Sequence, residues 1–350
     1  MKDKYKTVLV TGGLGFIGRN LIIRLLTEGC KVINIDIARN ARFDTNIFED
    51  DNYIWLEENI TRCGPFNHVF EKYKPDCVFH LAADSHVDKS INNPMLFTET
   101  NVLGTSALLF EANEYLKKHI TPHFKMIYVS TDEVYGSAEN HNGIPATENT
   151  MCNPNSPYAA SKAGGDMVAR AYHRTYGFPI ITTRCSNNYG PYQYPEKFIP
   201  RMIYLLSTGK PAELYGSGEQ KRDWIHVSDH IQAMFDLLEQ GKIGETYNVA
   251  TEKSVDNRTM VRIIWRMLID ICNRNPPPYG IQVPIENYIK SIQDRPAHDQ
   301  EYLINAEKIR EETGWKPKTE LVEGLYHTVQ WYVRNWKWIE KCITEINERR

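Results

Sequence analysis

The stretch Thr11-Gly12-Gly13-Leu14-Gly15-Phe16-Ile17-Gly18 lies between an apolar run, residues 7–11, and an amphipathic run, residues 16–28. It matches GxGxxG and also carries glycine at three-residue spacing, at Gly12, Gly15 and Gly18. After a predicted strand and at the start of a predicted helix, such glycines let the backbone approach a pyrophosphate held at the helix N-terminus. The stretch therefore predicts a dinucleotide-binding α/β fold.

The next apolar run, residues 31–36, ends at Asp36, which lies 18 residues after Gly18. A carboxylate at this place accepts hydrogen bonds from the ribose hydroxyls of adenosine and repels a 2′-phosphate, so NAD is favoured over NADP. Arg39 and Arg42 follow closely, and arginine can accommodate a 2′-phosphate. NADP therefore stays open as the alternative cofactor.

Further apolar runs at residues 53–56, 77–83, 125–130 and 179–184 are separated mostly by helical patterns. Near-continuous apolar strands between helices predict an α/β protein with a Rossmann-type, doubly wound parallel sheet. After about residue 184, aromatic and proline-rich loops interrupt shorter elements. We therefore expect a Rossmann domain at residues 1–186. Residues 187–350 would mainly form a smaller C-terminal substrate-binding α/β domain, with some segments returning to the first. Three tryptophans at residues 331–338 are expected to serve packing.

Composition excludes several classes of protein. The 350 residues carry 41 basic and 44 acidic side chains, without the basic excess typical of nucleic-acid binding. No window approaches the ~18 apolar residues of a membrane helix, and the N-terminus lacks a signal-peptide pattern. Seven scattered cysteines form neither a CxxC pair nor a metal-ligand spacing. We expect a cytoplasmic protein with reduced cysteines, no metal, and neither nucleic acid nor membrane as partner.

Tyr158 is the only tyrosine followed by a basic residue four positions on, Lys162. The pair opens a helical run that ends at Tyr176, so both side chains should lie on one helix face. A nearby ammonium favours phenolate, and we therefore expect Lys162 to lower the pKa of Tyr158. Such a tyrosine can remove a hydroxyl proton during hydride transfer.

The glycine motif together with YxxxK resembles the extended short-chain dehydrogenase/reductase family. Residues 130–136, Ser-Thr-Asp-Glu-Val-Tyr-Gly, narrow the resemblance to nucleotide-sugar 4,6-dehydratases of the dTDP-glucose type. Similar motifs recur along nearly the whole chain at residues 80–88, 101–105, 187–192, 195–200, 216–218, 222–224 and 294–299. Two positions depart from the family pattern: Asp84 stands where bacterial members usually have Glu, and Asn59-Ile60 replaces Asp-Ile.

The resemblance implies a reaction and a set of site residues. Oxidation at carbon 4 of the sugar makes the hydrogen on carbon 5 acidic, water is lost across carbons 5 and 6, and the hydride returns to carbon 6. The implied catalytic residues are Thr131, Asp132, Glu133, Tyr158 and Lys162. Glu133 would act as the base and Asp132 as the acid, because two adjacent carboxyl groups push one pKa up.

NAD would contact Gly12, Gly15, Phe16, Ile17, Gly18, Asp36, Arg39, Asn59, Ile60, Leu81, Ala82, Ala83, Thr100, Tyr158, Lys162 and Asn188. The nucleotide-diphospho-glucose would contact Ser85, Thr131, Asn187, Lys197, Phe198, Tyr215, Arg222, Asn257, Arg295 and His298. Lys197, Arg222 and Arg295 would hold the diphosphate.

Two other functions remain open. An epimerase or decarboxylase of the same fold is the enzyme alternative, which Asp132 disfavours, and a silent NAD-binding scaffold is the alternative from another class. Thymine and uracil cannot be told apart, since one methyl group in an apolar pocket contributes only ~1–3 kcal/mol. Relatives pair the helices that match residues 97–118 and 158–176 across a two-fold axis, so a homodimer is expected.

Overall fold

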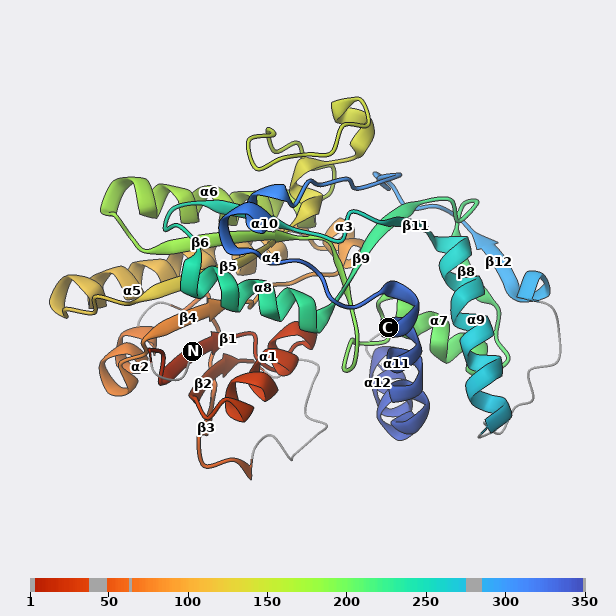
Figure 1. Ribbon diagram of the computed structural model, residues 1–350, viewed down its shortest axis with the longest axis horizontal. Coiled ribbons are helices and arrows are strands. Elements are labelled where there is room, and N and C mark those ends of the chain that lie inside the picture. Colours follow the sequence, from red (N-terminus) through yellow and green to blue (C-terminus); the bar gives the residue numbers. More distant parts are fainter. Residues whose placement is uncertain (1–3, 38–48, 63–64, 275–284, 349–350) are drawn as a thin grey trace.

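The computed structural model describes residues 4–37, 49–62, 65–274 and 285–348 (Figure 1). Arg39 and Arg42 lie outside the described residues. The central sheet has seven parallel strands in the order β10-β6-β5-β4-β1-β2-β3. These strands are β1 (Thr7–Thr11), β2 (Lys31–Asp36), β3 (Tyr53–Glu57), β4 (Cys77–His80), β5 (Lys125–Thr131), β6 (Ile180–Cys185) and β10 (Thr246–Val249). A doubly wound parallel sheet, as the apolar runs predict, is therefore confirmed.

The strand order changes direction between β1 and β4. From β1 the chain builds outward through β2 and β3, and then crosses back to add β4, β5 and β6 on the other side of β1. In open α/β sheets, ligands bind outside the carboxyl ends of the strands at this switch point. The glycine loop after β1 lies there.

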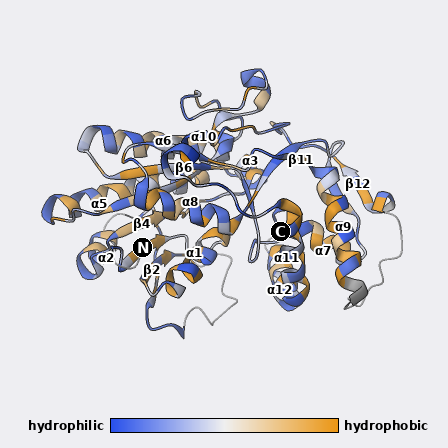
Figure 2. Ribbon diagram, viewed as in Figure 1, coloured by the Kyte–Doolittle hydropathy of each residue, from blue (hydrophilic) through white to orange (hydrophobic). Residues whose placement is uncertain are grey.

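Helices cover both faces of the sheet. The helices α1 (Phe16–Thr27) and α8 (Val227–Gln240) pack on one face, and α2 (Pro65–Tyr73), α5 (Thr105–Lys118) and α6 (Pro157–Tyr176) on the other. Side chains alternate along β1. Val8 and Val10 belong to the hydrophobic core on the side of α1 and α8, and Leu9 belongs to the core on the side of α2 and α5. Figure 2 shows helices with one hydrophobic and one hydrophilic side, as two-sided coverage requires.

A separate core fills the C-terminal part, seen at the right of Figure 1. Its helices are α7 (Phe198–Ser207), α9 (Asn257–Arg274), α11 (Leu321–Arg334) and α12 (Trp336–Glu348). Two small sheets lie beside them, β11-β9-β7 (Ser254–Asp256, Lys221–His226, Asn187–Tyr189) and β12-β8 (Ile289–Ile292, Ala212–Tyr215). Between these elements the chain returns to the first part, where α8 packs on the sheet and β10 extends it.

The remaining elements are short. They are α3 (Val87–Asn92), α4 (Pro94–Thr98), the π-helical η2 (Glu99–Gly104), α10 (Glu307–Thr313) and the 3-10 turns η3 (Asp132–Tyr135), η4 (Ala138–His141) and η5 (Ile285–Tyr288).

Two boundaries differ from expectation. The run 77–83 forms a strand only to His80, because its partner β1 ends at Thr11, which pairs with His80. The run 97–118 is not one α-helix, since a π-helical turn, η2, separates α4 from α5. Within that turn Asn101 bonds the backbone of Asp84 and the hydroxyl of Ser161, at 2.9 and 2.8 Å. Single π-helical turns inside α-helices are frequent at functional sites.

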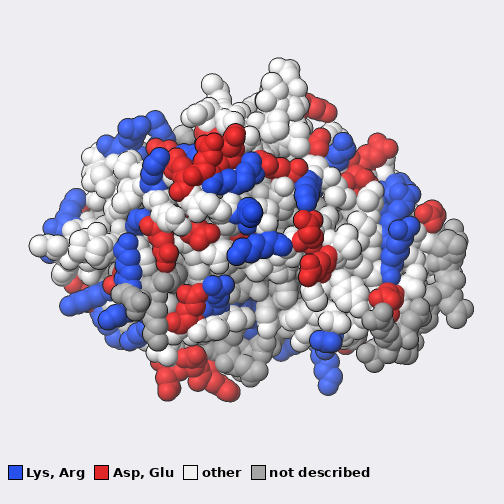
Figure 3. Space-filling model, viewed as in Figure 1, with Lys and Arg blue, Asp and Glu red and all other residues white. Residues whose placement is uncertain are grey.

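Surface charge is mixed on the face shown in Figure 3, where acidic and basic side chains are interspersed. None of the helices in the described ranges combines the length and the apolar character needed to span a bilayer. In the same part of the chain, no three His, Cys, Asp or Glu side chains are grouped so that they could hold a metal ion.

Gly165 lets α6 approach the Tyr128 side chain of β5 closely. A Cβ atom there would lie 2.1 Å from the Tyr128 hydroxyl and 2.9 Å from the Asn101 carbonyl oxygen. Gly165→Ala should therefore lower the free energy of unfolding by about 1–3 kcal/mol, as overpacking does. The loss should be smaller in a Tyr128→Phe background, which removes the nearest atom. Urea titration of both single variants and the double variant measures the coupling. Strict additivity would contradict this contact.

Candidate active site

The glycine loop holds the backbone close to the β4 loop. Gly12 has a φ of +74°, and a Cβ there would lie 2.6 Å from the Ala82 nitrogen. A Cβ on Gly18 would lie 2.3 Å from the Gly12 carbonyl oxygen. The N-cap of α1, Gly15, supplies no side-chain hydrogen bond. The first N–H groups of α1 thus stay available to an anion, as a pyrophosphate site requires.

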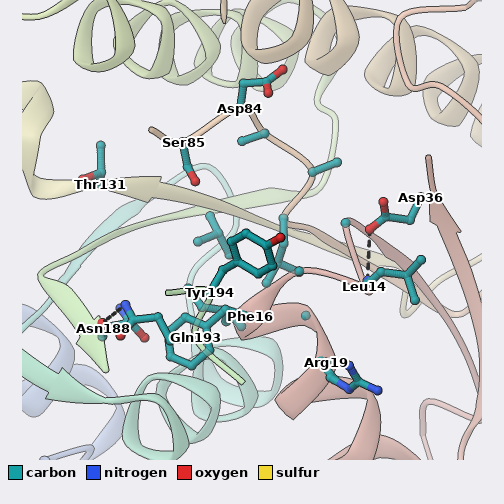
Figure 4. Close-up of a pocket in the computed structure, with 18 of the residues that line it drawn as sticks. Leu14, Phe16, Arg19, Asp36, Asp84, Ser85, Thr131, Asn188, Gln193 and Tyr194 are labelled. Atoms are coloured by element: carbon teal, nitrogen blue, oxygen red, sulfur yellow. Dashed lines mark hydrogen bonds between the residues drawn. The ribbon is translucent and has the colours of Figure 1, made fainter. Parts of the chain in front are cut away.

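Asp36 lies beside this loop, at the end of β2. One of its oxygens accepts a hydrogen bond from the Leu14 backbone N–H at 3.0 Å (Figure 4). The Asn34 side chain likewise accepts from Gly13 N–H at 2.9 Å. These bonds fix the loop against β2 and place the Asp36 carboxylate on the cavity wall.

All five residues inferred to be catalytic line this same cavity. The end of β5 brings Thr131, and η3 begins there with Asp132 and Glu133. Ser156 caps α6 by accepting from Ala159 N–H at 3.1 Å, and the first turns of α6 present Tyr158 and Lys162 on one face. The sequence spacing thus becomes a spatial cluster at the carboxyl edge of the sheet.

Lys162 is held by two contacts in a buried position. Its ammonium donates to the Val129 carbonyl oxygen at 2.7 Å and lies 4.4 Å from the centre of the Tyr128 ring. Burial lowers the pKa of Lys162 from 10.5 to about 8, and the nearby Asp166 carboxylate opposes this. The protein thus keeps a costly charge at the site.

The expected pKa of Tyr158 is wrong in direction. Its pKa lies well above the ordinary value of 10, because the phenol is buried and faces the carboxylate of Glu133, although a hydrogen bond with Thr131 lowers it. The Lys162 ammonium is directed to Val129 and Tyr128 instead. Phenolate formation therefore needs positive charge beyond that of the protein.

The two adjacent carboxyl groups have unlike surroundings. Burial raises the pKa of Asp132 well above its usual range, and the charges of Glu133 and Asp223 add to the effect. One Asp132 oxygen meets the Thr131 hydroxyl at 3.2 Å, and the other has no hydrogen-bond partner among the described residues. Burial also raises the pKa of Glu133, but Arg295, Arg222 and Lys197 oppose it. Like charges therefore add to the rise in the pKa of Asp132, whereas cationic side chains oppose the rise in the pKa of Glu133.

The cavity takes in the residues expected to bind the cofactor, apart from Arg39, which lies outside the described residues. Of the expected substrate residues, Ser85, Thr131, Asn187 and Lys197 line it. The Lys197 ammonium donates to the Ser85 carbonyl oxygen, and the side-chain oxygen of Asn187 is buried with no hydrogen-bond partner in the described part of the chain.

Six expected substrate residues are not among those lining the cavity. Asp88 pairs with Arg295 at 3.1 Å and accepts from the Tyr215 hydroxyl at 2.9 Å. His298 bonds Asp294 at 2.6 Å. Phe198 stacks on Trp224 at 5.9 Å, and Asn257 begins α9.

Arg222 is largely committed to the fold. Its guanidinium donates to the carbonyl oxygens of Lys221, Gln300 and Asp299, at 2.6, 3.2 and 2.9 Å. It also lies 4.4 Å from the centre of the Tyr302 ring. These three bonds leave two of the five N–H donors of the guanidinium without a carbonyl acceptor among the described residues, so Arg222 could hold a diphosphate from this position.

Sequence reasoning missed several residues. The Tyr302 hydroxyl lies 2.8 Å from an Asp299 oxygen and 3.4 Å from a Glu133 oxygen. Arg19, Tyr194 and Trp338 line the cavity, from α1, the loop after β7 and α12. No local spacing singles them out, because each meets the site through contacts distant in sequence. The one available signal for Tyr302 is its position three residues after the 294–299 motif.

Comparison with known proteins agrees with this geometry. A family model described as GDP-mannose 4,6 dehydratase matches residues 9–328. A dTDP-glucose 4,6-dehydratase of Xanthomonas campestris pv. campestris is 41% identical over 343 residues, covering 96% of each chain. That of Salmonella typhimurium is 41% identical over 347 residues, covering 95% of this chain and 94% of the relative.

Solved structures show the same relationship. The dTDP-glucose 4,6-dehydratase DesIV of Streptomyces venezuelae, with NAD and TYD bound, has a TM-score of 0.85 at 37% identity, covering 96% of this chain and 99% of that one. A UDP-glucose 4-epimerase of Thermotoga maritima has a TM-score of 0.82 at 26% identity, covering 94% and 99%.

The buried charge of Lys162 predicts a stability effect. Below about pH 8 the folded state holds this charge at a cost, whereas the unfolded chain does not. Lys162→Met should therefore raise the free energy of unfolding at neutral pH, by about 1–3 kcal/mol. The gain should shrink between about pH 8 and 10.5, as the folded state releases the Lys162 proton before the unfolded chain does. Urea titration at several pH values measures it.

The exposed Lys210, changed to Met, serves as the control and should show little pH-dependent difference. A destabilised Lys162→Met at neutral pH would contradict the assigned cost.

Proposed function

Because the chain belongs to the GDP-mannose 4,6-dehydratase family, we propose that it is an NAD-dependent nucleotide-sugar 4,6-dehydratase. It would convert dTDP-glucose to the 4-keto-6-deoxyglucose derivative and water, a step toward rhamnose or another deoxysugar. The observation that carries the proposal is the carboxyl pair of the buried Asp132 and the partly buried Glu133, in the same cavity as the glycine loop and Tyr158. An epimerase would have no use for a second acid–base pair.

NAD fits the residues present. The uncapped start of α1 suits its pyrophosphate, and Asp36 suits the adenosine ribose. Bound NAD supplies a hydride acceptor for carbon 4 and a donor for carbon 6, and its positive nicotinamide ring favours a phenolate nearby. The relatives solved with NAD support this choice.

Oxidation at carbon 4 falls to Tyr158, Thr131 and Lys162. Tyr158 removes the hydroxyl proton as a phenolate, and its raised pKa makes that phenolate a strong base once it has formed. The Thr131 hydroxyl lies at the end of β5 and orients the same sugar oxygen. Lys162, whose ammonium donates to the Val129 carbonyl oxygen, would hold the cofactor ribose.

Elimination falls to the two carboxyl groups. Glu133, whose pKa three cationic side chains restrain, is the base for the proton on carbon 5. Asp132, protonated by burial and by the charge of Glu133, gives its proton to the departing hydroxide of carbon 6. The Tyr302 hydroxyl donates to a Glu133 carboxylate oxygen at 3.4 Å and would help to position it.

The nucleotide half of the substrate would extend from this cavity toward Lys197, Asn187 and the Asp88–Arg295 pair. Relatives named for dTDP-glucose support thymidine over uridine. Side-by-side kinetics with dTDP-glucose and UDP-glucose test this choice. We place the protein in the cytoplasm, where the five described cysteines, all free, would stay reduced.

Because the two carboxyl groups have different roles in elimination, we expect their substitutions to slow the reaction to different degrees. Glu133→Gln cannot accept the proton from carbon 5, but Tyr158 can still support oxidation. Reduced cofactor should therefore accumulate on Glu133→Gln with dTDP-glucose present, seen as nicotinamide absorbance. Turnover should fall about 10²-fold or more. Asp132→Asn should slow elimination less, because an activated enolate can expel a poorly assisted hydroxide.

Tyr158→Phe is the matched comparison for this experiment. It should lose turnover by a similar factor without any reduced cofactor, because the block comes before oxidation. Normal product from Glu133→Gln would show that another group removes the proton.

An apolar surface on two neighbouring helices supports a homodimer. Met95, Leu103, Phe110, Met167 and Tyr176 are exposed large apolar side chains on α4, η2, α5 and α6. The helices α5 and α6 pack side by side, so these residues belong to one layer of the molecule. Exposed apolar patches mark interaction sites, and several large apolar side chains on neighbouring elements of one layer suit such a patch. A second copy of this layer would form a two-fold four-helix bundle.

Leu103→Glu combined with Phe110→Glu should therefore give a monomer, because two charges would be buried in the interface. Light scattering after gel filtration measures the mass. Val322→Glu on α11, where the side chain is 61% exposed, is the control and should stay dimeric. A monomeric wild type, or a dimeric double variant, would contradict this assignment.

A further inference from the structure

The C-terminal helix α12 contributes to the cofactor cavity. Trp338 lines it, together with Gly15, Phe16 and Arg19 from the glycine loop and α1. About 320 residues separate the two ends of this wall in sequence. Trp338 therefore does more than the packing role that the sequence suggests for it.

An aromatic cluster fixes Trp338 in place. The Tyr192 ring lies 4.6 Å from Trp331 and 6.1 Å from Trp338, and Trp338 lies 5.4 Å from Trp331. The Arg19 guanidinium lies 4.6 Å from the centre of the Tyr192 ring. Asn20 of α1 donates to the Pro191 carbonyl oxygen at 3.0 Å. The loop after β7 thus joins α1 to α12.

Tyr194 provides a second link to α12. Figure 4 shows its ring among the residues that line the cavity, near Phe16. Its hydroxyl lies 3.3 Å from the Cys342 carbonyl oxygen and 3.1 Å from a Glu345 carboxylate oxygen. A cavity residue is therefore tied to the second half of α12.

We propose that Trp338 and Tyr194 are NAD-retaining residues, which make α12 a structural part of the cofactor site. The proposal rests on the proposed function, in which NAD is restored in every turnover and need not leave. The indole nitrogen of Trp338 is covered and has no hydrogen-bond partner among the described residues, so the side chain acts through its apolar ring. An apolar wall excludes water and strengthens the attraction between a pyrophosphate and the start of α1.

The test compares two tryptophans of the same helix. Trp336 stacks on Tyr204 of α7 at 5.8 Å and is not among the residues lining the cavity, so Trp336→Ala is matched to Trp338→Ala. Each protein is loaded with NADH, and its release into excess NAD is followed by fluorescence. Trp338→Ala should release the nucleotide at least about tenfold faster, equivalent to about 1.4 kcal/mol. Trp336→Ala should stay within about twofold of wild type.

Tyr194→Phe keeps the ring but loses both contacts to α12, and its release rate should lie between wild type and Trp338→Ala. If Trp338→Ala does not fold, the NADH release rates of Tyr194→Phe and Trp338→Phe test the proposal instead. Wild-type release from Trp338→Ala, or equal acceleration in Trp336→Ala, would overturn the proposal. The assay contains no nucleotide sugar. A wild type that holds NADH but leaves dTDP-glucose unchanged would therefore refute the proposed function and not this one.

Discussion

A parallel sheet brings the carboxyl ends of its strands to one edge, and the site depends on that constraint. The segments that follow β1, β4, β5 and β7 supply much of the cavity wall. His80 braces this edge by bonding Thr11 at 2.7 Å and Thr105 at 2.9 Å, which joins β1, β4 and α5. Burial lowers the pKa of His80 to about 3, so the brace remains uncharged at physiological pH. The glycine loop can then approach Ala82 without a side chain between them.

Burial and neighbouring charges at this edge of the sheet also give the two adjacent carboxyl groups different pKa shifts. Asp132 and Glu133 are adjacent in sequence, yet several cationic side chains oppose the rise in pKa only at Glu133. At Asp132, the charge of Asp223 raises the pKa further. The same desolvation raises the pKa of Tyr158 and lowers that of Lys162. The protein therefore accepts a local loss of stability at the site, which its two-sided core offsets elsewhere.

Sequence reasoning predicts the sheet because its strands are near-continuous apolar runs. It infers Tyr158 and Lys162 from their spacing on a helix and Thr131, Asp132 and Glu133 from the family resemblance, and all five line one cavity. It failed where distant contacts decide. The strand at residue 77 ends with its partner β1, Arg222 turns to backbone carbonyls, and Trp338 reaches the cavity only through the aromatic cluster. It also gave Tyr158 the wrong pKa direction, because spacing shows a neighbouring charge but not the depth of burial.

Transfer of one hydrogen within one cavity is the central claim, and an isotope label tests it most directly. Substrate carrying deuterium on carbon 4 of the glucose is converted by the wild-type protein in ordinary water, and the product is analysed by NMR. The account predicts that the label appears on carbon 6 of a 4-keto-6-deoxy product, with a solvent proton on carbon 5. Label returned to carbon 4 of an epimerised sugar, or left on free reduced cofactor, would contradict it.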